Sequence, residues 1–344
     1  MKRLFKRLTW LFVVVLLAAF ALAFQGYRSL VTPLEFPGQV LQIAPGSGFS
    51  TVTAELQQRN IITQPLFWKI YARITGKAKQ VQAGEYELTG GVSARQLLEK
   101  MVRGDVVRYQ VTLIEGRTFK QLLAALAEND ELHHELSGLT PKQVMAKLGK
   151  PEEHPEGRFF PDSYHFTRGT SDLDILKRAY QRLETVLEEE WQQREKELPY
   201  KSAYEALIMA SIVEKETGLA EERPEIAGVF VRRLNKGMRL QTDPTVIYGL
   251  GDQYQGNIKR KHLLLATPYN TYVIRGLPPT PIAAAGREAI HAALHPKPGK
   301  SLYFVARGDG SHFFSDTLEQ HNEAVRRYQI NQRAEQYRSS PKTN

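Results

Sequence analysis

The first 24 residues constrain this chain more than any other feature. Four basic residues within positions 2–7 precede an apolar run from Leu8 to Phe24, which only Thr9 interrupts. This run of 17 residues is at the short limit for a helix that spans a membrane. Because basic residues favour the cytoplasmic side of such a segment, the sequence predicts a cytoplasmic N-terminus and an exported remainder.

A cleaved signal peptide is the competing interpretation of the same segment. Residues Ala21-Leu22-Ala23 resemble a small-residue cleavage site. Sequence physics alone leaves the two interpretations open, but both place the bulk of the protein outside the cytoplasm.

Length and composition limit the kinds of protein that the exported part can be. A chain of 344 residues allows about two domains. The chain has no cysteine, which excludes a disulfide scaffold, a thiol nucleophile and a cysteine metal site. Its net charge of +9 suits an anionic polymer or an anionic lipid surface. Nucleic acid is not an expected partner, because no nucleic-acid-binding motif accompanies the charge.

Residues 38–104 form the first candidate domain, which a short linker at 31–37 with two prolines separates from the apolar run. Alternation and helical periodicity predict a small unit of strands and helices. Ser93 is the expected N-cap of its last helix. The predicted strands cover 40–43 and 83–88, and the predicted helices cover 50–59, 65–74 and 94–102.

Residues 105–331 form the second and larger candidate domain, followed by a polar, flexible tail at 332–344. The pattern predicts a strand at 107–113, a long amphipathic helix at 171–198 and a β-hairpin at 302–315. A capping box at Thr317 to Gln320 is expected to open the last helix. The predicted fold class is therefore α+β: an N-terminal anchor helix, a small strand and helix subdomain, and a larger mixed domain.

The most informative segment is Ser202 to Thr217, which reads SAYEALIMASIVEKET. On a helix, Ile212, Met209 and Val213 lie within about 60° of Glu216 at 100° per residue. Glu216 thus continues an apolar face. A partly desolvated carboxyl has a raised pKa, which suits a general acid.

Glu214 lies on a different side of the same helix, about 160° from Glu216. The two carboxylates therefore cannot pair across one helix. The alternative for Glu216 is a structural glutamate paired with an arginine such as Arg232 or Arg239, since structural ion pairs also perturb pKa values.

A second candidate segment follows, MRLQTDPTVIYGL at 238–250. Its polar triplet Gln241, Thr242 and Asp243, with Tyr248 further on, can line a cleft that binds substrate. The alternative is a simple turn before a helix, because Asp before Pro breaks the chain.

A third segment, TPYNTYVIRGLPPTPI at 267–282, is a proline-rich loop that contains Asn270 and Tyr272. Aromatic faces and side-chain amides are what sugar recognition needs, and this loop offers both. The alternative is a rigid surface loop.

Metal and cofactor chemistry find no support in the sequence. His291 and His295 are four residues apart, but no third ligand lies nearby in the chain, so a helix surface is the preferred interpretation. HExxH, P-loop, dinucleotide-binding and GxSxG patterns are all absent. We therefore expect neither a metal ion nor a cofactor.

At these segments the chain resembles the MltG (YceG-like) family of endolytic murein transglycosylases, and the resemblance covers nearly the whole exported part. It is carried by ASIVEKET (210–217), GMRLQTDPTVIYG (237–249), TPYNTY (267–272), GLPPTPIA (276–283) and LYFVA (302–306).

The resemblance implies an organisation and a site. It implies a single-pass anchor in the cytoplasmic (inner) membrane, with the catalytic part outside, and a LysM-like subdomain at 38–104. The second glutamate of EKET, Glu216, matches the family's catalytic residue. The implied partners are glycan strands, membrane lipid through the N-terminal helix, and peptidoglycan synthases.

The implied reaction cleaves the β-1,4 bond between N-acetylmuramic acid (MurNAc) and N-acetylglucosamine (GlcNAc) in nascent strands, leaving 1,6-anhydro ends. One carboxylate then suffices, whereas a glycosidase that uses water normally needs two. Two other interpretations stay open. One is a non-catalytic wall-binding scaffold of the elongation machinery, and the other is a hydrolytic muramidase with Asp243 as second carboxylate.

Overall fold

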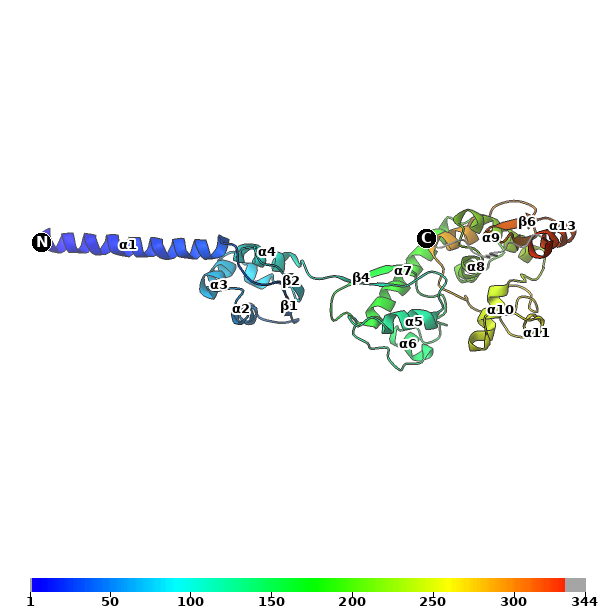
Figure 1. Cartoon of the computed structure of the whole chain (residues 1–344), viewed down its shortest axis with the longest axis horizontal. Coiled ribbons are helices and arrows are strands. Elements are labelled where there is room, and N and C mark those ends of the chain that lie inside the picture. The colour runs from blue at the N-terminus through cyan, green and yellow to red at the C-terminus, as the bar shows by residue number, and fades with distance from the viewer. Residues whose placement is uncertain (1, 332–344) are drawn as a thin grey trace. The chain divides into compact units, whose positions relative to one another are not determined.

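The computed structural model describes residues 2–331, and its contacts divide the chain into two compact units (Figure 1). The first unit extends to Tyr109 and also takes in His165–Gly169. The second contains Gln110–Tyr164 and the described residues from Thr170 onward. The two units are described separately.

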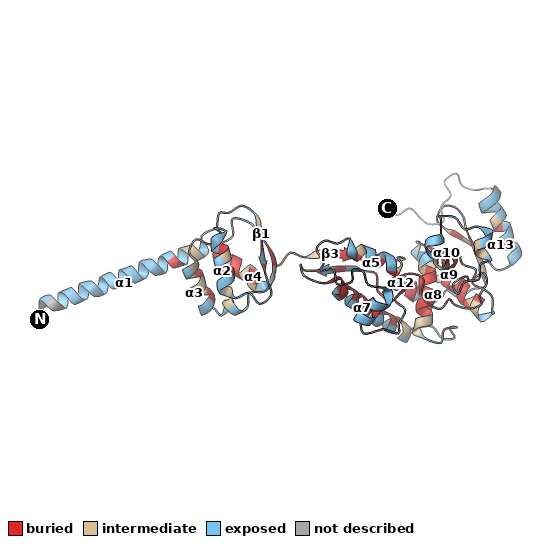
Figure 2. Ribbon diagram, turned by 90° about the horizontal axis from the view of Figure 1, so that it is seen from below, coloured by how far each residue is buried: buried red, intermediate tan, exposed pale blue. Residues whose placement is uncertain are grey.

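The first unit begins with α1 (Lys2–Val31), a helix of 30 residues. Within the described part of the chain, its segment Phe5–Val31 is the one helix long and apolar enough to cross a membrane, with a mean hydropathy of 2.3. Figure 2 shows this helix exposed along most of its length. The helix continues past the predicted apolar run through Gln25–Val31, where buried Gly26 lies against the ring of Phe67.

The rest of this unit is a strand–helix–helix–strand arrangement followed by a third helix. Strands β1 (Gln39–Ile43) and β2 (Gly84–Leu88) pair antiparallel, with Leu41 opposite Tyr86. The other elements are α2 (Phe49–Gln58), α3 (Pro65–Ile74), the 3₁₀ turn η1 (Lys77–Lys79) and α4 (Ala94–Arg103).

These elements enclose one apolar core centred on Trp68, which is fully buried and donates its indole N–H to the carbonyl of Ala94 at 2.9 Å. Ser93 caps α4 through a capping box with Gln96, which confirms the predicted N-cap. The predicted strands and helices of this region are present, with bounds that differ by a few residues at most.

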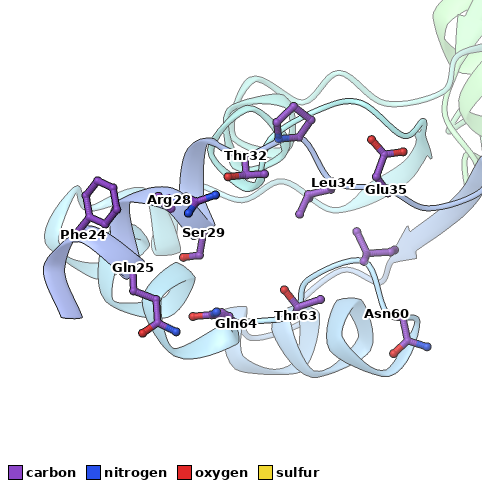
Figure 3. A pocket seen from close by; sticks show the side chains of 12 residues that line it. Phe24, Gln25, Arg28, Ser29, Thr32, Leu34, Glu35, Asn60, Thr63 and Gln64 are labelled. Atoms are coloured by element: carbon purple, nitrogen blue, oxygen red, sulfur yellow. The ribbon is translucent and has the colours of Figure 1, made fainter. Parts of the chain in front are cut away.

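A cavity of about 560 Å³ lies in the first unit where α1 ends (Figure 3). Its lining combines the last turns of α1 with the segment after it and with the connection between α2 and α3. The lining residues are Phe24, Gln25, Arg28, Ser29, Thr32, Pro33, Leu34, Glu35, Asn60, Ile61, Thr63 and Gln64.

The core of the second unit is built around α8 (Ala203–Glu216), which is buried over eight consecutive residues, Ala206–Val213 (Figure 2). A helix that is apolar on all sides belongs in the interior of a domain. Four helices pack against it: α7 (Asp172–Gln192), α9 (Arg223–Asn235), α10 (Asp243–Leu250) and α12 (Arg287–Leu294).

Helix α7 is shorter than the sequence pattern predicts. Ser171 caps its start through a capping box with Asp174, but the helix ends at Gln192 rather than at Leu198. The reason is tertiary: the chain leaves the helix so that the amide of Glu195 can donate to the carbonyl of Leu294, at the end of α12, at 3.0 Å. Glu197 then adopts a left-handed conformation with φ of 63°.

The remaining elements are short. With β1–β2 of the first unit, their strands form three separate two-stranded sheets among the described residues. β3 pairs with β4, and β5 pairs antiparallel with β6 in the predicted hairpin. The predicted capping box at Thr317 opens the last α-helix. The bounds are β3 (Tyr109–Thr112), α5 (Phe119–Ala127), α6 (Pro141–Lys147), β4 (Ser163–Phe166), η2 (Ala220–Glu222), α10 (Asp243–Leu250), η3 (Gly251–Gln253), α11 (Arg260–Leu263), β5 (Tyr303–Ala306), β6 (His312–Ser315), α13 (Leu318–Val325) and a π-helical segment, η4 (Arg326–Asn331).

Candidate functional site

Glu216 is the last residue of α8, because Thr217 adopts an extended conformation with φ of −145° and ψ of 141°. The carboxyl of Glu216 therefore lies at the C-terminal end of a buried helix. The negative end of the helix dipole disfavours a carboxylate there. The position predicted from periodicity is thus an environment that favours the protonated form.

The hydroxyl of Thr242, the N-cap residue of α10, donates a hydrogen bond to Oε1 of Glu216. Burial raises the pKa of Glu216, the bond from Thr242 lowers it and the charge of Asp243 raises it, and the net pKa is about 7. A carboxyl with such a pKa holds a proton at neutral pH and can give it up.

Two threonines, Thr245 and Thr271, hold Thr242 in place. The backbone amide of Thr242 donates to Oγ1 of Thr271 at 3.0 Å, and the hydroxyl of Thr245 donates to the carbonyl of Thr242 at 2.7 Å. The hydroxyls of Thr245 and Thr271 are 2.9 Å apart, and all three residues are buried. Sequence reasoning missed Thr245 and Thr271, although both lie in the TDPT and NTY segments it had singled out.

Asp243 begins α10 and is exposed beside this buried group. The hydroxyl of Tyr272 donates to its Oδ1 at 2.7 Å. Burial, this bond and the charges of Asp243 and Glu216 raise the pKa of Tyr272. The structure thus brings together the predicted residues Glu216, Thr242, Asp243 and Tyr272, which come from three separate segments.

Gln241 has a left-handed backbone, with φ of 54°, which is uncommon for a residue other than glycine. Its amide donates to the carbonyl of Thr271 at 3.2 Å, and its side-chain oxygen accepts from Nη1 of Arg233 at 3.4 Å. Backbone strain of this kind concentrates at functional sites. Gln241 remains exposed, so it stays a candidate for contact with a ligand.

Asn270 does not fit the expected role in sugar binding. It is 1% exposed, and its Nδ2 donates to the carbonyls of His262, Leu263 and Leu265 at 2.7–3.1 Å. Its Oδ1 accepts from the amide of Tyr272 at 3.0 Å. The amide is fully used within the loop, so the residue shapes the segment that presents Tyr272.

Tyr248 is directed to another carboxyl. Its hydroxyl donates to Oε2 of Glu156 at 3.1 Å, and the amide of Phe119 donates to Oε1 at 2.9 Å. Glu156 is 4% exposed, and burial raises its pKa to about 7. Sequence reasoning missed Glu156, whose one signal is its place just before an aromatic segment, RFFPDSY at 158–164.

Glu214 and Glu216 have different partners, as the helical spacing predicts. Glu214 accepts from the amide of Gly286 at 3.1 Å and lies 3.8 Å from Arg223, and burial raises its pKa. Arg232, considered above as a partner of Glu216, instead donates to the carbonyls of Ser301 and Lys297.

His291 and His295 have a third possible metal ligand beside them, contrary to the expectation from sequence. Glu190, about a hundred residues earlier, lies with its Oε2 2.8 Å from Nδ1 of His291. Spacing along the chain could not show this, because α7 and α12 meet only in the folded domain.

The comparisons with known proteins agree on one family. The model of the YceG-like family matches residues 41–327. An endolytic murein transglycosylase of Bacillus subtilis is 33% identical, over 89% of this chain and 90% of that protein. One from Streptococcus pneumoniae is 26% identical over 82% of this chain, which spans 57% of that relative's length.

A solved structure adds the fold. A YceG-like protein from Listeria monocytogenes is 30% identical and superposes with a TM-score of 0.52, covering 83% of this chain and 98% of that one. Since the family model spans most of the sequence and both units described above, the chain belongs to the YceG-like family.

Proposed function

We propose that this protein is a lytic transglycosylase that cleaves the MurNAc–GlcNAc β-1,4 bond within peptidoglycan strands and leaves 1,6-anhydro-MurNAc ends. The observation that carries the proposal is the partly buried carboxyl of Glu216, held by Thr242 and adjacent to Asp243. Its relatives in Bacillus subtilis and Streptococcus pneumoniae are named endolytic murein transglycosylases, which supports the same reaction.

In the first step, protonated Glu216 acts as general acid. It transfers its proton to the glycosidic oxygen, which leaves with the GlcNAc residue, and the C1–O bond breaks with positive charge developing on the MurNAc ring. A pKa of about 7 keeps a large fraction of Glu216 protonated at neutral pH while leaving it acidic enough to donate.

In the second step, the Glu216 carboxylate acts as base. It takes the proton from the C6 hydroxyl of the same MurNAc residue, whose oxygen attacks C1 and closes the anhydro ring. The proton returns to Glu216, so the enzyme is regenerated without water. One carboxyl therefore serves both steps, which fits a site where Glu216 is the enclosed acid.

The neighbouring residues divide into two sets. Thr242 is a positioning residue, since it is buried and bonded to Glu216. Gln241 and Asp243 are exposed beside it, and Tyr272 is half-buried. We assign these three to holding sugar hydroxyls and acetamido groups. Tyr248, further along α10, instead donates its hydroxyl to Glu156.

The first unit fits a role in binding glycan and in holding the protein at the membrane. Its strand–helix–helix–strand order is that expected of a LysM-like glycan-binding subdomain at 38–104, and α1 suits a single-pass anchor. We therefore place the protein in the cytoplasmic membrane, with residues 38–331 outside the cytoplasm, close to nascent strands and the synthases that make them. The region 105–331 carries the reaction.

A hydrolytic muramidase is the second candidate, and one observation favours it. Asp243 is an exposed carboxylate next to Glu216, and hydrolases use a second carboxylate to activate water. In that reaction the product ends in a reducing MurNAc instead of an anhydro sugar. A non-catalytic wall-binding scaffold would yield neither product.

Product mass separates the three. Purified full-length protein is incubated with isolated glycan strands, and the fragments are analysed by mass spectrometry, with the Glu216→Gln protein as blank. We expect anhydro ends, lighter than reducing ends by one water. Reducing ends would establish the muramidase, and intact strands with retained binding would establish the scaffold.

A further inference from the structure

The ends of α7 and α12 bring together a cluster of metal-ligating side chains outside the candidate site. His291 and His295 are one helical turn apart, and their rings stack with centroids 4.2 Å apart. The carboxylate of Glu190, on α7, faces them and is 7% exposed. Each of the three side chains offers one ligand atom, and these atoms all lie within 4.8 Å of one another.

His295 carries the observation that points to a missing ligand. Its Nε2 is buried and has no hydrogen-bond partner among residues 2–331. A buried polar atom without a partner is destabilising, so such atoms are rare unless something binds them. A metal ion shared with the neighbouring imidazole and carboxylate would satisfy this nitrogen.

A further carboxylate lies beside the other ring nitrogen of His295. Oε1 of Glu195 is 3.9 Å from Nδ1 of His295. The backbone of Glu195 is tied to the end of α12 by its hydrogen bond to Leu294. This tie is what ended α7 earlier than the sequence predicts, so the same backbone turn places a carboxylate beside the histidines.

The local charges favour a cation. Arg287, one turn before His291, donates to Oε1 of Glu190 at 2.8 Å and pairs with Glu189. It leaves Oε2 of Glu190 to the imidazole of His291. The three carboxylates Glu189, Glu190 and Glu195 outweigh this single guanidinium by two charges, which a divalent ion would neutralise.

We propose that Glu190, His291 and His295 bind one Zn²⁺ ion, in place of the sequence expectation of no metal. Imidazole and carboxylate ligands suit Zn²⁺. Neighbouring ligand atoms around a tetrahedral ion lie about 3.3 Å apart, so the set closes by rotation of the exposed His291 side chain.

The proposed ion is structural. Its ligands are separate from the group formed by Glu216, Thr242 and Asp243. They join the C-terminal ends of α7 and α12, and both helices pack on α8, which carries Glu216. Zinc therefore links two helices of the core, and we expect it to raise the unfolding temperature of the protein.

The test measures zinc binding directly. The full-length protein is purified in detergent without a histidine tag, stripped with a chelator and titrated with ZnCl₂ in a calorimeter. We expect one ion per chain and an increase in unfolding temperature on adding zinc. The absence of saturable binding, or a bound ion that leaves the unfolding temperature unchanged, overturns the proposal.

Point variants locate the ion. His291→Gln changes an exposed side chain, so it should fold as the unmodified protein does, and it should weaken zinc binding by about tenfold or more. His295→Gln should do the same. His133→Gln is the matched control, because His133 is an exposed histidine of the same unit outside the cluster.

The control protein should bind zinc with unchanged affinity. If the His291→Gln and His295→Gln proteins bind zinc as tightly as the unmodified chain does, the proposed site is wrong. Circular dichroism of each variant confirms that it is folded before titration, so a loss of binding reports the ligand and not the fold.

Discussion

The hydroxyl of Thr242 donates to the carboxyl of Glu216, although the two residues are 26 positions apart in the chain. This bond joins the end of α8 to the beginning of α10. It also stabilises the charged form of Glu216 against burial and against Asp243, which both favour the protonated form. The pKa of about 7 is the balance of these effects, so each can be altered separately.

Replacing Glu216 by Gln should abolish strand cleavage while the protein stays folded. The amide keeps the shape of the side chain but has no transferable proton. Acid–base groups contribute about 10²–10⁴-fold to rate, and here one group serves both steps, so the loss should reach the upper end. Release of anhydro-terminated fragments measures it.

Glu214→Gln is the matched control for that prediction. Glu214 is also buried and also has a raised pKa, but it bonds to Gly286 and not to Thr242. It should retain far more activity than the position-216 variant, with some loss of thermal stability. An active Glu216→Gln protein, or a folded and inactive Glu214→Gln protein, contradicts the assignment.

Asp243→Asn should move the alkaline limb of the pH profile of kcat/KM to lower pH. The charge of Asp243 raises the pKa of Glu216, so removing it lowers that pKa. The acid then loses its proton at lower pH. Thr242→Val should act in the opposite direction, because it removes the bond that lowers the pKa. Profiles that shift in the same direction would show that this balance is misassigned.

Glu216→Gln should stabilise the protein more at pH 8 than at pH 4. The pKa of Glu216 rises from 4.5 to about 7 on folding, so the folded state binds the proton more tightly. The stability that this provides is fully present below pH 4.5 and is lost as pH rises through 7. The uncharged amide avoids that loss, worth up to about 3 kcal/mol. Denaturant unfolding at both pH values measures it, and an equal effect at both contradicts the raised pKa.

Removing residues 38–104 while keeping α1 should weaken activity on intact wall much more than activity on short soluble glycan strands. The second unit has its own apolar core around α8, so it should stay folded. Pull-down on purified sacculi checks binding in parallel. Unchanged binding and unchanged activity on intact wall would remove the proposed glycan-binding role of this subdomain.

The segment Leu8–Phe24 should remain uncleaved in the mature protein, because α1 continues as one helix to Val31 and is long enough to span a membrane. N-terminal sequencing of protein from the membrane fraction checks this. A mature chain that starts at Phe24 would support the signal-peptide interpretation instead.

Local sequence determined most of the elements and one central residue. Capping boxes at Ser93, Ser171 and Thr317 fix helix starts through contacts within four residues, so they can be read without the fold. The same is true of the directions of Glu216 and Glu214, because helical spacing alone sets them about 160° apart. The resemblance of the motif blocks supplied the reaction.

Tertiary structure decided what depends on contacts between distant segments. The amide of Asn270 suits sugar binding by residue type, but in the fold it donates to three carbonyls of its own loop. Glu156 carries a raised pKa only because folding buries it against Tyr248 and Phe119. The end of α7 and the meeting of Glu190 with His291 likewise depend on how two helices pack. Burial and hydrogen bonding between remote residues set these properties, and neither is encoded in the spacing of residues along the chain.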